Sequence, residues 1–89
     1  METFGEIWKR IIAHEGDLFH TKTGVDFRYS VRGNSIDPGR NRLLPQSDFE
    51  WYFNRGRVEG PGEIRDDVQG SAYVWAIMED MRIRPSHWR

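Results

Sequence analysis

Apolar side chains near the N-terminus recur with the spacing of an amphipathic helix. The pattern is i, i+3, i+4, i+7, i+8, and its members are Phe4, Ile7, Trp8, Ile11 and Ile12. Thr3 precedes this run as an N-cap residue, and Glu6 stands three positions later, which is the spacing of a capping box. Gly16 follows at a place where a left-handed residue commonly ends a helix. The pattern predicts a helix over residues 4–15.

The apolar period changes to two in the next segment. The apolar positions Phe27, Tyr29 and Val31 alternate with the polar positions Arg28, Ser30 and Arg32. Residues 18–22 can form a partner strand, joined to the first through a short loop that contains Gly24. Turn signals at residues 33–34 and 37–39 leave room for two more short strands, at residues 35–36 and 42–44. We therefore expect a small antiparallel sheet whose polar face looks outward.

The second half of the chain has helical patterns. Ser47 can cap a helix with Glu50 at the capping-box position, and Gly56 ends the apolar stripe that begins at Phe49. One or two helical turns are expected after Pro61. A further helix is expected over residues 72–81, where few polar side chains interrupt the first two turns.

This order of elements predicts the α+β class, because sheet and helices are segregated along the chain. We expect one domain over residues 1–89, with an N-terminal amphipathic helix, a small antiparallel sheet of two to three strands, and two to three C-terminal helices. Residues 85–89 are expected to form a loose tail after Pro85. A chain of 89 residues buries only about 60–65% of its unfolded surface, so its core is thin. The chain contains four Trp, three Tyr and five Phe. These large side chains compensate for the thin core, because each can bury much apolar area.

Charge and composition indicate a folded, soluble protein. Charged residues make up 30% of the chain, and the formal net charge is −1. The chain shows no apolar run of membrane-spanning length and no signal-peptide pattern. It also contains no cysteine, which fits the cytoplasm. We therefore expect a cytoplasmic protein with no membrane partner.

Arginine dominates the positive charge. Eleven of the 13 basic residues are Arg, and residues 22–57 carry seven basic against four acidic side chains. Residues 59–80 carry one basic and six acidic side chains. A dipolar surface should result, and local fields of this kind steer partners more than net charge does.

The candidate binding residues follow from this charge pattern. Arg28 and Arg32 should lie about 13 Å apart on one strand face, with other guanidinium groups beside them, so that the row could follow a phosphate backbone or an acidic protein surface. The full set is Arg28, Arg32, Asn34, Arg40, Arg42, Trp51, Arg55 and Arg57. The arginines can also be present without a binding role, since polar strand positions that face water are commonly charged and a GC-rich genome favours Arg codons. Turn chemistry is sufficient to account for Asn34, and Trp51 lies off the apolar stripe, beside Arg55.

Catalytic, metal and cofactor chemistry find little support in the sequence. His14 and His20 are six positions apart, not four as in a helical zinc pair. No nucleophile elbow, Walker loop or dinucleotide-binding glycine pattern occurs. We expect no catalytic residue, no metal and no cofactor.

The leading hypothesis is a non-enzymatic binding module for nucleic acid or an acidic protein surface, acting through the Arg-rich sheet face. The alternative is a protein-interaction or homodimerisation module that uses partly exposed Trp and the oppositely charged halves of the chain. A small enzyme is the third and least favoured hypothesis.

Overall fold

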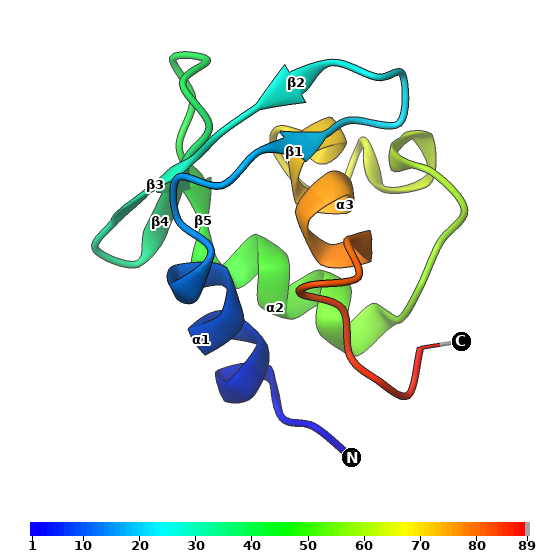
Figure 1. Ribbon diagram of the computed structural model, residues 1–89. Helices are drawn as coiled ribbons and strands as arrows, with labels where there is room; N and C mark the ends of the chain where they lie inside the picture. Colours follow the sequence, from blue (N-terminus) through cyan, green and yellow to red (C-terminus); the bar gives the residue numbers. More distant parts are fainter. Residues whose placement is uncertain (89) are drawn as a thin grey trace.

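A computed structural model describes residues 1–88 of the chain (Figure 1). In chain order, its elements are α1 (Phe4–Ala13), β1 (Phe19–His20), β2 (Asp26–Phe27), β3 (Ser30–Arg32), β4 (Ser35–Asp37), β5 (Leu44–Pro45), α2 (Gln46–Arg55), the 3-10 helix η1 (Pro61–Ile64) and α3 (Ser71–Glu79). The α+β class predicted from the sequence is confirmed. Helix α3 packs against α2, η1 and β1, and the hairpin of β1 and β2 passes over it in Figure 1. This central position explains why the sequence of α3 is apolar on nearly all sides.

The continuous strand expected over residues 27–32 is wrong, because the segment divides between two sheets. One sheet pairs β1 with β2, and the other has the order β3-β4-β5, with all pairs antiparallel. At the division, the backbone carbonyl of Tyr29 accepts a hydrogen bond from the N–H of Gly16 at 2.9 Å. Two residues later, the N–H of Val31 donates to the carboxylate of Glu15 at 2.7 Å. The loop after α1 therefore takes the hydrogen bonds that a continuous strand would have offered to a neighbour.

Tyr29 turns inward at this point and connects α1 to both sheets. Its side chain is 2% exposed, and its ring lies 5.3 Å from that of Phe19, centroid to centroid. Its hydroxyl donates to the backbone carbonyl of Ile11, in the last turn of α1, where carbonyls lack partners within the helix. Tyr29 thereby closes the end of α1 against the sheets.

The N-terminal cap predicted for the first helix forms, whereas the cap predicted for α2 does not. The hydroxyl of Thr3 accepts from the N–H of Glu6 at 3.3 Å, which confirms the cap of α1. The capping box expected at Ser47 is absent, because α2 begins at Gln46 and Pro45 occupies the N-cap position. The N–H of Gln46 instead donates to the carbonyl of Asn34 at 2.8 Å. The turn between β3 and β4 thus supplies the acceptor that a capping side chain would have given.

The expectation of a loose tail fails for residues 85–88. Trp88 is 8% exposed, and its ring lies 5.4 Å from that of Tyr52. The N–H of Ser86 donates to the carboxylate of Glu2 at 2.6 Å. Aromatic burial and this contact hold the segment against α2 and the N-terminal residues. Arg89 lies outside the described residues.

Gly70 and Gly33 provide a matched pair for testing the packing at the start of α3. Both have φ of 60°, in the left-handed region where a side chain costs about 1 kcal/mol. A Cβ on Gly70 would lie 2.5 Å from a methyl group of Leu44, whereas a Cβ on Gly33 would meet no atom within 4 Å. Gly70→Ala should therefore cost ~1–3 kcal/mol more stability than Gly33→Ala, measured by urea unfolding. Equal losses in the two variants would contradict this packing.

The two buried tyrosines predict a loss of stability at alkaline pH. Burial raises the pKa of Tyr29 and of Tyr52 above the ordinary value of 10.0, so the unfolded chain releases these protons first as the pH rises. Their contribution is complete below pH 10.0 and is lost as the pH rises toward the folded pKa. Urea unfolding at about pH 8 and about pH 11 should show this fall, and Tyr29→Phe should make it shallower. The same fall in Tyr29→Phe as in the unaltered protein would contradict the assignment.

Candidate functional site

The guanidinium row predicted for one strand face does not form, because Arg28 lies between the two sheets. Arg28 donates to the backbone carbonyl of Gly16 at 2.7 Å. Arg32 ends β3, and its Nε lies 2.9 Å from the carboxylate of Asp37. The two arginines therefore belong to different local structures.

Arg40 and Arg42 lie in the loop between β4 and β5, which projects from the body of the protein in Figure 1. Arg40 bends back over β2 and α3, where it donates to the hydroxyl of Tyr73 at 3.2 Å and to the carbonyl of Asp26 at 3.3 Å. Arg42 instead lines a hollow of about 400 Å³ together with Arg32. Of the four central arginines, the structure therefore brings together Arg32 and Arg42.

The remaining predicted residues lie elsewhere. Asn34 is exposed in the turn between β3 and β4, and its carbonyl holds the start of α2. Trp51 is half-buried and packs against the core. Arg55 is exposed in the last turn of α2. Arg57 donates to Glu79 at 2.8 Å and lines a different hollow from Arg32.

We call the hollow beside Arg42 the basic hollow, lined by Arg32, Asp37, Gly39, Asn41, Arg42 and Leu43. All five residues from 39 to 43 are exposed, and the side chain of Leu43 is 49% exposed. Asn41 has φ of 55°, a left-handed conformation that Asn tolerates better than most residues. The loop thus presents an apolar side chain beside two guanidinium groups, outside the core.

A second hollow, which we call the acidic hollow, shares Leu43 with the basic hollow. It measures about 570 Å³, and its lining includes three carboxylates, Asp48, Asp66 and Asp67, against one basic side chain, that of Arg65. Partial burial raises the pKa of Asp48, although a hydrogen bond from the N–H of Gln69 opposes this shift. Hollows of opposite charge therefore meet at Leu43, which sharpens the dipolar surface expected from the sequence.

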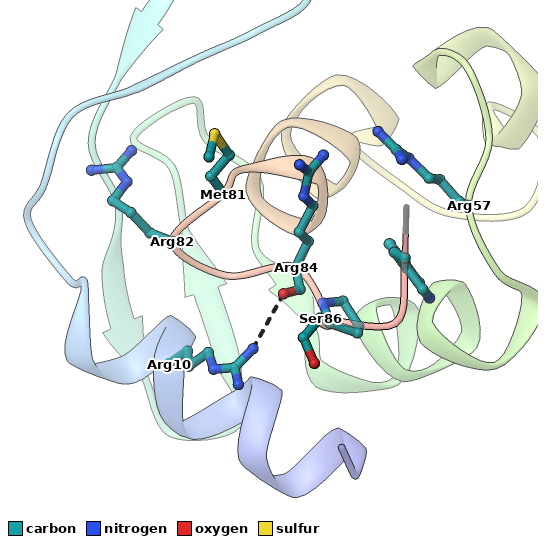
Figure 2. A pocket seen from close by; sticks show the side chains of 8 residues that line it. Arg10, Arg57, Met81, Arg82, Arg84 and Ser86 are labelled. Carbon is teal, nitrogen blue, oxygen red and sulfur yellow. Dashed lines mark hydrogen bonds between the residues drawn. The ribbon is translucent and has the colours of Figure 1, made fainter. Parts of the chain in front are cut away.

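A further arginine cluster, which we call the arginine groove, corresponds to no pattern in the sequence. It measures about 720 Å³ and is lined by Arg10, Arg57, Arg82 and Arg84, together with four residues of the segment 81–88 (Figure 2). Of these arginines, the candidate set held Arg57 alone. The others come from α1 and the C-terminal segment, and no local spacing in the sequence connects such distant positions.

The described part of the chain offers few groups of side chains that could bind a metal or act together in catalysis. Within residues 1–88, no three His, Asp or Glu side chains gather as metal ligands would. His14 pairs with Asp17 at 2.8 Å and His20 pairs with Asp26 at 2.6 Å, as two separate surface contacts. None of the helices within the same residues has the length and apolar character that crossing a membrane requires.

No family model matches the chain, and no curated protein or solved structure matches it either.

Proposed function

We propose that this protein is a cytoplasmic, non-enzymatic binding module whose basic hollow takes an acidic segment of another protein. The observation that carries the proposal is the loop of residues 39–43, which exposes Leu43 in a hollow that Arg32 and Arg42 also line. Exposed loops on a packed scaffold are common carriers of binding residues. Arginine with a neighbouring apolar side chain supplies both directional hydrogen bonds and buried area at an interface.

The guanidinium groups of the basic hollow can accept new partners. Within residues 1–88, no acceptor is hydrogen-bonded to the side chain of Arg42, and Arg32 has a side-chain exposure of 65%. In the ion pair of Arg32 with Asp37 the carboxylate is half-buried, with a side-chain exposure of 21%, but the exposed guanidinium is screened by water, and exposed pairs contribute about 0–1 kcal/mol. An incoming carboxylate can therefore bind Arg42 bidentately and compete for Arg32 at little cost.

An acidic protein segment fits this surface better than nucleic acid does. Four aromatic rings that lie near the arginines in the sequence are turned inward, since Phe27, Tyr29, Phe49 and Tyr52 are all at most 4% exposed. The rings of Trp51 and Phe53 are half-buried against the core. No ring lines the basic hollow among the described residues, so bases would lack the stacking that supports single-strand binding.

Replacing two arginines together tests this proposal. Arg32→Gln with Arg42→Gln should weaken binding of a synthetic peptide of alternating Glu and Leu by about tenfold or more, because two charge-assisted contacts are lost. Fluorescence anisotropy at low and high salt measures this, with Lys9→Gln and Arg55→Gln as a control pair of equal charge outside the hollow. Single- and double-stranded DNA and RNA are titrated in parallel. Binding of a nucleic acid in place of the peptide would reassign the partner, and no binding at low salt would reject the proposal.

Self-association is a second candidate function, favoured by the shared position of Leu43. Two copies related by a twofold axis near Leu43 would place the basic hollow of each against the acidic hollow of the other. Arg42 would then face Asp66 or Asp67, and the two exposed Leu43 side chains would be covered. This arrangement accounts for the exposed Leu43 without a foreign partner.

A charge exchange tests self-association. Sedimentation velocity over a range of protein concentrations should show a dimer that Arg42→Glu weakens, because the substitution brings like charges together. Mixing Arg42→Glu with Asp67→Arg should restore pairing between the two variants. A monomer at every concentration, or a dimer that Arg42→Glu leaves unchanged, would contradict this candidate.

A further inference from the structure

The arginine groove takes no part in binding through the basic hollow. It lies where α1, the loop after α2 and the segment 81–88 meet, and Figure 2 shows that its four arginines come from these three parts. Its volume of about 720 Å³ falls in the ordinary range of small-ligand pockets.

Two of its four guanidinium groups bond both to a carboxylate and to backbone carbonyls. Arg10 pairs with Glu2 and donates to the backbone carbonyls of Ile83 at 3.1 Å and Arg84 at 3.2 Å. Arg82 donates to both carboxylate oxygens of Asp80, at 2.8 and 2.9 Å, and its guanidinium lies 3.9 Å from the ring centre of Phe19. These two arginines hold the walls of the groove.

The other two guanidinium groups keep donors available. Arg57 bonds to Glu79 through its Nε, and within residues 1–88 no acceptor is bonded to its terminal nitrogens. The side chain of Arg84 has no hydrogen-bonded acceptor within the same residues. In Figure 2 the side chains of Arg57 and Arg84 point toward the same region of the groove, whereas Arg82 points away from it.

The charge of the groove is positive even after its internal pairs are counted. Its four arginines are bonded to three carboxylates, those of Glu2, Glu79 and Asp80. One unit of positive charge is therefore left without a carboxylate among the described residues, and a partly enclosed site strengthens its attraction for an anion.

We propose that Arg57 and Arg84 bind the phosphate group of a small phosphomonoester. A phosphate dianion offers three acceptor oxygens, which can engage two guanidinium forks, whereas a single carboxylate is satisfied by one fork. The organic part of the ligand would lie against the apolar atoms of Met81 and Trp88, which line the same groove. Met81 is 83% exposed, so covering it would remove apolar surface from water.

Titration with phenyl phosphate tests this assignment, with the indole N–H signal of Trp88 in NMR spectra as the readout. The signal should shift in a saturable way at up to about 10 mM ligand, which covers millimolar sites. Arg84→Gln should weaken the affinity by about tenfold, through the loss of a charge-assisted contact. Arg84 is the residue to replace, because Arg57 also supports the buried carboxylate of Glu79.

Two matched controls make the result decisive. Arg55→Gln removes the same charge from an exposed position outside the groove, so it should leave the affinity unchanged. Benzoate presents the same ring with a single carboxylate and should bind at least about tenfold more weakly. The proposal is overturned by the absence of a saturable shift, by equal affinity in Arg84→Gln and the unaltered protein, or by equal affinity for benzoate. Arg32→Gln with Arg42→Gln should retain phenyl phosphate binding, so the two proposed sites can fail separately.

Discussion

The buried hydroxyl of Tyr52 is the interaction on which the C-terminal half of the fold depends. From α2 it donates to Glu79 of α3 at 2.6 Å and accepts from the N–H of Val58 at 3.3 Å. Arg57 holds the second oxygen of Glu79, and Trp88 packs on the tyrosine ring. Two helices, a loop and the C-terminal segment therefore meet at one polar contact inside a thin apolar core. A small domain without disulfides has few other ways to fix such parts together.

The arginines have a structural use that neither surface binding nor codon bias describes. Several of them donate to backbone carbonyls where short elements end, and these carbonyls belong to Gly16, Leu18, Asp26, Ile83 and Arg84. Helices of nine or ten residues and strands of two or three leave many carbonyls outside regular ladders. The five donors of a guanidinium can reach such groups from a long side chain. A binding role is thereby confined to the arginines that the fold leaves available.

Local periodicity predicted the helices and the α+β order. The sequence of α1 carries an amphipathic apolar stripe and a capping side chain, and that of α3 is apolar along most of its length. It failed where a distant residue decides the outcome. The strand over residues 27–32 divides because Gly16 takes the carbonyl of Tyr29, and no pattern within that strand records this. The tail packs because Trp88 reaches Tyr52 across the fold. The sequence predicted two residues of the basic hollow, Arg32 and Arg42, because they lie close together along the chain. It did not predict the arginine groove, because the groove joins residues from both ends of the chain.

The bonds from Arg10 to the carbonyls of Ile83 and Arg84 span 73 and 74 positions of sequence. Contacts of such separation form only after nearly the whole chain has been closed into a loop, at a large entropic cost. During translation α1 is made before residues 83 and 84, so Arg10 cannot reach these carbonyls until that later segment has been made. The apolar stripe of α1 packs on α2 through Phe4 against Phe53 and Trp8 against Phe49, so this stripe is exposed until α2 has been made, and exposed apolar surface favours aggregation and chaperone binding. The order of synthesis thus leaves the apolar face of α1 uncovered until α2 and the segment 81–88 have been made.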